Sequence, residues 1–411
     1  MGNSHHASWI AALLPACFHP SYDRPACGPH SECPGDLTCN QGFCELADAP
    51  GSQIPGGGFL DGGSHDSGSP DAVSDVPLLC FGAYPTVCFS SIADVPTAPL
   101  ILMGDIDTMT SALCNTHNNQ GDFCVVSGAG ITIPTGKTIR AFGARPLVLL
   151  STTTFDLSGS LDVSSTSAPG ALHPTGPGVV TIASCSEFAV APTASSGGFG
   201  GSFGGKGGNG HPQDTTAVPT SGSAVLFPAK LRAGCPGSSG STVSSGVTPG
   251  AGGKGGGAVS VIASEIQLNG QINASGAFGV AGGAVKAGGG GGGSGGMIVL
   301  DSPSIVPGQT FALFANGGGG GQGGSSGNGG GAGQNGFEST GPFVAGLGGN
   351  NGTTQGGSGG SGAFGTAKKD GANASSDNLS GNAGGGAGGG GAGFIAAHGI
   401  TTNIAPASTP P

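Results

Sequence analysis

The sequence predicts an all-β protein, a right-handed parallel β-helix or β-solenoid that carries long glycine-rich loops. An apolar pattern in residues 147–164 recurs without a gap in residues 258–275. Within each copy, apolar and polar residues alternate, which is the period of a strand with one buried face. Long glycine tracts separate the two copies, as expected for a solenoid whose coils are interrupted by insertions.

The two copies match position by position. The aligned pairs are Val148 with Val259, Leu150 with Val261, Phe155 with Ile266, Leu157 with Leu268 and Leu161 with Ile272. Similar short apolar runs precede the first copy, at Ile131–Ile133 and Ile139–Phe142. This spacing predicts short strands and coils of roughly 20–25 residues. Further coils are expected at residues 178–190 and 297–315, with a shortened final coil at residues 393–404.

The composition fits this fold class and excludes others. Glycine accounts for 91 of the 411 residues, and only 8% of the residues are charged. Collagen is excluded because the glycines form runs, such as Gly288–Gly293, and do not recur at every third position. The glycine-rich excursions, residues 192–256, 276–296 and 316–392, are too poor in side chains to fold through burial. They either stay mobile or pack as threefold polyglycine helices bonded through their backbones, a shape related to polyproline II.

Charge is distributed unevenly along the chain. The net charge is −11, and residues 25–136 contain twelve acidic residues but no Lys or Arg. The remainder of the chain, from Lys137 onward, is nearly neutral. Because no basic patch is present that would neutralise a phosphate backbone, a nucleic-acid partner is not expected.

The first cysteine indicates export. Cys17 follows Leu14-Pro15-Ala16 at the end of a short apolar stretch, which resembles the lipobox of a bacterial lipoprotein. We therefore expect residues 1–16 to be a signal peptide and Cys17 to be acylated; the alternative is a cysteine that pairs or stays free. No apolar run approaches the roughly 20 residues that a membrane-spanning helix needs, so a lipid is the expected anchor. Without Cys17, ten of the eleven cysteines remain, enough for five disulfides in an oxidising compartment.

A small cysteine-rich module is predicted over residues 17–44. Its 18-residue core contains Cys27, Cys33, Cys39 and Cys44, and it is too short to build a hydrophobic core. Disulfides are the expected source of its stability, with three possible pairings. A zinc site is the competing interpretation, but structural zinc sites favour tighter cysteine pairs. An acidic linker rich in Gly, Pro and Ser follows at residues 45–79 and is expected to act as a spacer without an EF-hand.

The glycine-rich domain, residues 80–411, contains six further cysteines. Four of them lie close together in sequence and can form two local bridges; they are Cys80, Cys88, Cys114 and Cys124. Cys185 and Cys235 bracket much of the longest excursion. If these two are joined, the bridge would stabilise the fold by about 4 kcal/mol on the chain-entropy model.

Candidate catalytic groups are few. The glycine tracts imitate known motifs, but Gly207 stands where a phosphate-binding loop needs Ser or Thr, and no strand-to-helix context surrounds them. The carboxylates and cations that could form a site in the solenoid are Asp156, Asp162, Glu187, Glu265 and Asp301, with Arg140 and Arg145. In the second copy of the repeat, Gln267 and Asn273 occupy the positions of Asp156 and Asp162, as expected for solvated outward positions. We expect no catalysis, no cofactor and no metal site.

Residues 124–165 give the most specific resemblance. This stretch, with the cysteines before it and the glycine tracts after it, resembles uncharacterised glycine-rich, cysteine-rich surface lipoproteins of Gram-negative bacteria. Those proteins combine an N-terminal cysteine module of the EGF-like or Dickkopf-like kind with a predicted β-helix. The resemblance implies a place at the outer membrane or cell surface, and it brings no established activity.

Two functions are expected from these observations. The first is a non-catalytic structural or adhesive protein, secreted or anchored to the cell surface by lipid on Cys17, that presents glycine-rich loops to an extracellular polysaccharide or surface matrix. The alternative is a β-helix that binds or degrades polysaccharide. Aromatic residues make up only 5% of the chain and just two are tyrosines, so stacking platforms for sugars are scarce.

Overall fold

The computed structural model describes the following parts of the chain: residues 37–40, 43–46, 79–114, 122–172, 174–185, 189–213, 217–225, 227–325, 332–350, 356–365, 368–375 and 383–398. Two compact units divide the chain, residues 1–74 and residues 75–411. The predicted signal peptide, Cys17, Cys27 and Cys33 lie outside the described residues, as does most of the predicted linker.

In the first unit, two short strands form an antiparallel hairpin. They are β1 (Leu37–Asn40) and β2 (Phe43–Leu46), and their register places Cys39 opposite Cys44. The second strand extends to Leu46, beyond the predicted end of the cysteine module at residue 44. It does so because Glu45 and Leu46 continue the pairing with β1.

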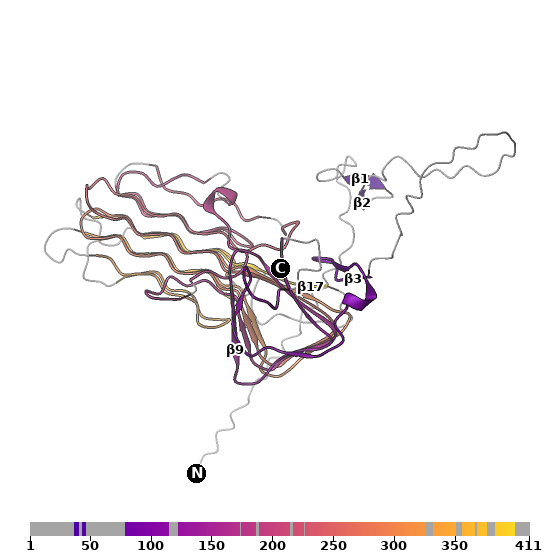
Figure 1. The fold of residues 1–411 in the computed structure, drawn as a ribbon. Helices are drawn as coiled ribbons and strands as arrows, with labels where there is room; N and C mark the ends of the chain where they lie inside the picture. Colours follow the sequence, from indigo (N-terminus) through magenta and orange to yellow (C-terminus); the bar gives the residue numbers. More distant parts are fainter. Residues whose placement is uncertain are drawn as a thin grey trace, which may run out of the picture. The chain divides into compact units, whose positions relative to one another are not determined.

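The second unit is a parallel β-solenoid (Figure 1). One sheet joins β5 (Leu100–Ile101), β8 (Ile131–Ile133), β10 (Leu147–Leu157), β12 (Ala258–Leu268), β14 (Met297–Asp301) and β17 (Phe394–His398), with β7 (Cys124–Gly128) on β10 and β15 (Ile305–Pro307) on β12. A second sheet joins β6 (Ile106–Asp107), β9 (Thr138–Phe142), β11 (Ser160–Asp162), β13 (Gln271–Asn273) and β16 (Ala312–Phe314). The described residues contain no α-helix, only two 3-10 turns, η1 (Ile92–Asp94) and η2 (Ile182–Ser184).

Most of the predicted coils are present, and one is not. Residues 297–315 supply three strands that stack on β12 and β13, and β17 begins the predicted final coil. The coil predicted at residues 178–190 is wrong, because the described part of that range contains η2 and no strand. Residues 178–185 lead instead to Cys185, whose disulfide with Cys235 draws the chain away from the stack of coils.

The register between β10 and β12 departs from the sequence alignment over its first half. Leu147 pairs with Val259, one position from its aligned residue, whereas Phe155 pairs with Ile266 as aligned. A β-bulge between Ser151 and Thr154 absorbs the difference. The Ser151 hydroxyl donates to the Thr154 carbonyl at 2.8 Å, which supports the irregular backbone at this point.

The first halves of these strands are buried on both faces, where the alternation predicted one. Inward-facing side chains such as Leu149 and Val261 form the core of the solenoid. Outward-facing side chains such as Val148 and Val299 form a second core. The second core is covered by the antiparallel hairpin of β3 (Leu79–Phe81) and β4 (Val87–Phe89) and by Phe203, Leu231 and Cys235 of the first excursion. In the second half of each strand, buried and half-buried residues alternate as predicted.

The described parts of the glycine-rich excursions are ordered through their backbones. In residues 288–296 each amide donates to a neighbouring segment, and the acceptor segment changes with a period of three residues. Amides 288, 291 and 294 donate to residues 235–241, amides 289, 292 and 295 to residues 385–391, and amides 290, 293 and 296 to residues 274–280. A period of three is the geometry of the polyglycine helix, so the second of the two alternatives for the excursions is confirmed.

Three inner segments, residues 287–296, 315–324 and 383–393, each bond to six surrounding segments. We name the whole assembly the glycine lattice; it comprises residues 195–211, 231–257, 274–296, 315–325, 332–350, 356–364, 368–375 and 383–393. Figure 1 shows these segments as layered, nearly parallel traces that extend to one side of the solenoid. Several run directly into strands, as residues 287–296 run into β14, so the lattice continues the hydrogen bonding of the sheets.

At the glycines of the inner segments there is no room for a Cβ atom. A Cβ atom on Gly291 would lie 1.9 Å from the Phe199 carbonyl oxygen, and one on Gly293 would lie 2.0 Å from that of Lys254. Both contacts are with backbone, which cannot move without breaking lattice hydrogen bonds. Glycine is therefore required at these positions by close approach of neighbouring chains.

We predict that Gly291→Ala lowers the free energy of unfolding by about 3 kcal/mol, because overpacking displaces hydrogen-bonded backbone. Gly104→Ala is the matched control, since a Cβ there would meet nothing within 4 Å. The control should change stability by less than about 1 kcal/mol. Thermal unfolding of both variants, followed by circular dichroism, measures the difference. Equal midpoints for the two variants would contradict a tightly packed lattice.

Candidate functional site

The described carboxylates and cations that were considered as a possible site each bond to nearby structure. Arg140 and Asp162 form an ion pair at 2.5 Å, and Arg145 donates to the Thr108 carbonyl at 2.7 Å. Asp301 accepts the backbone amide of Tyr84 at 3.3 Å and thereby holds the β3–β4 connection. The groups therefore hold local structure.

The remaining carboxylates of that set are also held locally. Asp156 accepts from the Ser158 hydroxyl at 2.8 Å, and Glu265 accepts from the Gln267 amide at 2.7 Å. Glu187 lies outside the described residues. Within the described part of the chain, no group of three or more His, Cys, Asp or Glu residues could hold a metal ion.

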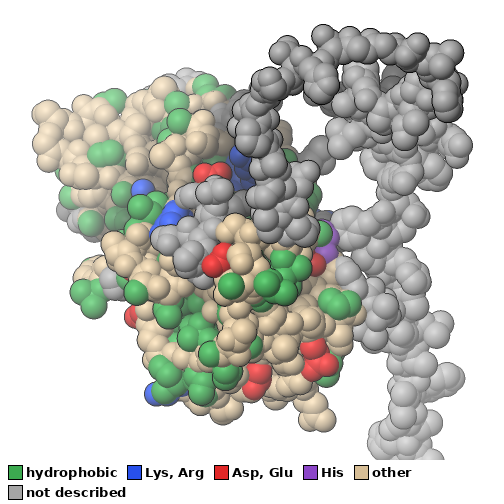
Figure 2. Space-filling model, turned by 45° about the vertical axis from the view of Figure 1, so that its right-hand side comes forward, with side chains coloured by type: hydrophobic (Ala, Val, Ile, Leu, Met, Phe, Trp, Pro, Cys, Tyr) green, Lys and Arg blue, Asp and Glu red, His purple; other side chains and the backbone are tan. Residues whose placement is uncertain are grey.

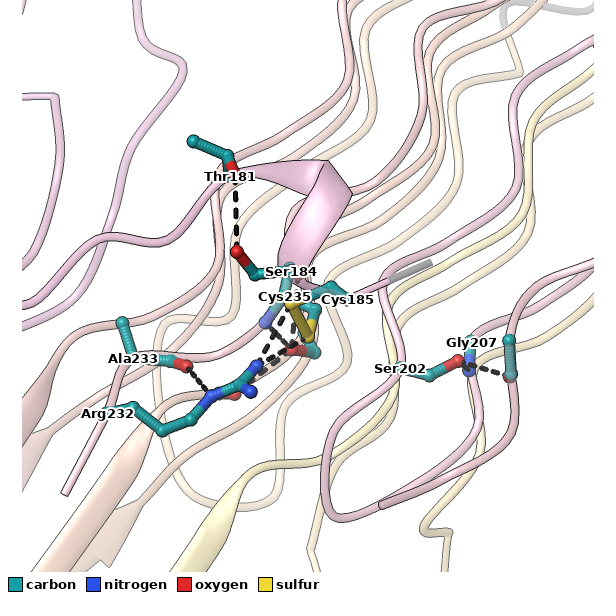
Figure 3. The surroundings of a disulfide bond; sticks show 11 residues. Thr181, Ser184, Cys185, Ser202, Gly207, Arg232, Ala233 and Cys235 are labelled. Atoms are coloured by element: carbon teal, nitrogen blue, oxygen red, sulfur yellow. Dashed lines mark hydrogen bonds between the residues drawn. A yellow bond between two sulfur atoms is a disulfide. The ribbon is translucent and has the colours of Figure 1, made fainter. Parts of the chain in front are cut away.

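Three disulfides join cysteines of the second unit. The pairs are Cys80 with Cys88, Cys114 with Cys124, and Cys185 with Cys235. Figure 3 shows the third of them, with the Arg232 side chain directed at it. One guanidinium nitrogen lies 3.0 Å from each sulfur, and the guanidinium lies over the Phe203 ring at 5.0 Å. Three disulfides are typical of a protein from an oxidising compartment.

Arg232 belongs to an aromatic cluster on the outer face of the first sheet. The rings of Phe203 and Phe394 pack edge-on with centroids 4.9 Å apart, and those of Tyr84 and Phe227 are 5.3 Å apart. Burial raises the pKa of Tyr84 to about 12, although the nearby positive charge of Arg232 acts in the opposite direction. Burial also lowers the pKa of Arg232, against the influence of Tyr84. The cluster packs the first excursion onto the solenoid.

We predict that replacing Cys185 and Cys235 together with serine lowers the free energy of unfolding by about 4 kcal/mol, because the bridge closes a loop of 50 residues. The same double change at Cys80 and Cys88, which are separated by 8 residues, should cost about 2.5 kcal/mol. Thermal unfolding under non-reducing conditions compares the two variants. A larger loss at the shorter loop would show that the long loop is held by the lattice alone.

Sequence analysis did not single out Glu338. This half-buried carboxylate lies at the lattice edge, where it accepts the Ser167 amide at 3.0 Å. Burial, with a smaller contribution from the negative charge of Asp162, raises its pKa above the ordinary value. Hydrogen bonds from Thr166 and Ser167 and the charge of Arg140 act in the opposite direction but are outweighed. Its spacing matches no motif, so no sequence signal pointed to it.

Glu338 should make stability depend on pH. Its pKa is higher in the folded chain, so the unfolded chain releases this proton first as the pH rises. Stability from this group is therefore full below its unfolded pKa of about 4.3 and falls as the pH rises through the folded value. We predict that Glu338→Gln, which can still accept from Ser167, is more stable than the unmodified protein at pH 7 and equally stable at pH 4. A pH series of thermal midpoints measures this, and an advantage that does not change with pH would contradict it.

A groove lined by three lysines lies at another edge of the lattice. It has a volume of about 670 Å³ and is open to solvent. Its lining residues are Lys206, Gly207, Asn209, Lys368, Lys369, Asp370, Gly371, Ala372 and Asn373. We name it the lysine groove. On the face of the molecule that Figure 2 shows, charged side chains are few and scattered.

Backbone bonds join the two walls of the lysine groove. The Gly371 amide donates to the Lys206 carbonyl, and the Ala374 amide donates to the Asn209 carbonyl, each at 2.9 Å. Sequence analysis could not foresee this juxtaposition, because the walls come from different excursions. The juxtaposition of the two walls depends on which lattice segments pack side by side.

No family model, no curated protein and no solved structure matches this chain. In the described part of the chain, no helix combines the length and apolar character needed to cross a membrane. Functional inference therefore depends on the chain's own residues.

Proposed function

We propose that this chain is a non-catalytic, exported structural or adhesive protein that holds a rigid glycine lattice outside the cell. The observation that carries the proposal is the lattice. In Gly288–Gly293 every residue donates one backbone hydrogen bond to a neighbouring segment and accepts another. Such an interior has no side chains to react with a substrate, but it holds the residues at its edges in fixed positions.

Several observations support export and anchoring. Three disulfides fit an oxidising compartment. The lipobox-like sequence before Cys17 favours a lipid anchor. An acidic, glycine-rich linker at residues 45–79 would hold the lattice away from the membrane. We place the protein at the outer membrane or in the surrounding matrix.

The proposal includes finer details of the architecture. Parallel strands joined by crossover connections are nearly always right-handed, which supports a right-handed β-helix. The pairing of Cys39 opposite Cys44 in the first unit supports a disulfide-rich module over residues 17–44. That module would stand at the front of the domain that begins at residue 80.

A second function is polysaccharide binding. The lysine groove favours it, because the groove brings positive charge from two excursions onto one open surface. Polysaccharide degradation is less favoured, since the acidic residues of the solenoid, Asp162 and Asp301 among them, are engaged in structural contacts.

We predict that Cys17 carries the lipid. In a Gram-negative host grown with an alkyne-tagged fatty acid, the full chain should become labelled and should sediment with the membrane. Cys17→Ser should lose the label and leave the membrane fraction, because the acylated sulfur is absent. Cys27→Ser serves as the control and should keep the label. An unlabelled parent chain, or label that persists in Cys17→Ser, would refute the anchor.

A further inference from the structure

We propose that the lysine groove binds an acidic polysaccharide, one whose repeating units carry carboxylate or sulfate groups. This inference rests on the proposed surface function. It names the class of ligand for the second function, polysaccharide binding. The chain contains only 11 Lys and Arg residues. Three of these, Lys206, Lys368 and Lys369, line this single groove.

The lattice brings these lysines together. Lys206 lies in the first excursion, residues 192–256, whereas Lys368 and Lys369 lie in the third, residues 316–392. The two segments are neighbours because their backbones bond at Lys206 and again at Asn209. Both segments also bond to residues 383–393, the inner segment that fixes their separation. The groove is therefore a preformed surface.

The walls form a repeating ladder. Asp370 accepts the Lys206 amide at 2.8 Å, and Asn373 accepts the Asn209 amide at 2.8 Å. Each wall thus advances by three residues, one turn of its threefold helix, between rungs. At a rise of about 3.1 Å per residue, the rungs are about 9 Å apart. This spacing is comparable to the length of a disaccharide in an extended chain, so successive rungs can meet successive repeats of a polymer.

The chemistry of the groove suits distributed negative charge. Lysine ammonium groups are flexible point charges, unlike the planar guanidinium that favours bidentate recognition of a single anion. With its Oδ1 atom accepting from Asn209, the Asn373 side chain retains its NH₂ group as a donor for hydroxyl or carboxylate oxygens. Asp370 is held by the Lys206 amide, and the three lysines outnumber it.

Neighbouring side chains favour sugar over single-stranded nucleic acid. Nucleic-acid grooves combine positive charge with aromatic side chains on which bases stack. No aromatic residue lines the lysine groove, and nearby Phe364 lies under Lys368, with the ammonium 5.8 Å from the ring centre. An open groove that holds several weak contacts suits a polymer, whose many repeats raise the effective affinity.

The test uses the full chain and three immobilised polysaccharides: polygalacturonate, dextran sulfate and uncharged dextran. The groove variant is Lys206→Ser with Lys368→Ser and Lys369→Ser. The matched control, Lys230→Ser with Lys254→Ser and Lys286→Ser, removes the same charge outside the groove. We expect the protein to bind at least one acidic polymer but not dextran. The affinity for that polymer should fall tenfold or more in the groove variant and change less than twofold in the control. Comparison of the two acidic polymers distinguishes carboxylate from sulfate recognition.

Other outcomes would overturn the inference. Equal losses in the two triple variants would show nonspecific charge attraction, and equal binding to dextran would remove the role of charge. Tighter binding to a single-stranded oligonucleotide than to either acidic polymer would assign the groove to nucleic acid. Thermal midpoints of all variants exclude misfolding, and the corresponding Lys→Gln triple replaces any serine variant that fails to fold.

Failure of the groove and failure of the surface function can be separated. If Cys17 is acylated but no acidic polymer binds, the groove assignment is wrong and the surface protein stands. Release of reducing ends in the binding samples would contradict the non-catalytic function, whereas the two triple variants still report on the groove.

Discussion

The hydrogen bond between backbone amide and carbonyl, formed in three directions around each glycine segment, is the interaction on which the rest of the second unit depends. It requires that chains approach so closely that a Cβ has no place, as at Gly291, where it would lie 1.9 Å from a carbonyl oxygen. The same requirement accounts for the uninterrupted run Gly288–Gly293 at the centre of the lattice. Small or hydrogen-bonded side chains do occur in the inner segments, as at Ser294 and Ala387, which are fully buried.

Such a lattice cannot arise from isolated segments. Ordering one residue costs about 1–2 kcal/mol of backbone entropy, and glycine loses the most. A typical hydrogen bond returns only about 0.5–1.5 kcal/mol, so a single glycine helix would be unstable. The solenoid offsets this entropy cost because it aligns the ends of the glycine segments. Residues 287–296 continue into β14, and residues 383–393 continue into β17. The apolar core of the strands thus supports an assembly that has almost no apolar core of its own.

The repeat between residues 147–164 and 258–275 was sufficient to predict a parallel solenoid, because burial of alternate side chains leaves a clear period in sequence. The lattice could be named only as one of two alternatives, since glycine runs contain no side-chain pattern that distinguishes order from mobility. The one-residue offset at Leu147 depends on a bulge, and the second core depends on Phe203 and Leu231 covering a distant sheet. The lysine groove was invisible for the same reason: its walls meet only through the order in which lattice segments pack.

The lattice also constrains where function can reside. Its interior offers neither titratable groups nor space, so recognition is confined to edge segments, and threefold helices place edge residues at regular intervals of three. An enzyme needs several groups converging on one reacting atom, whereas parallel ladders present the same contacts repeatedly along a line. This geometry favours a ligand that is itself extended and periodic. Acidic polysaccharide has that form, and the lysine groove is an edge of the described lattice where three lysines lie beside such a three-residue repeat.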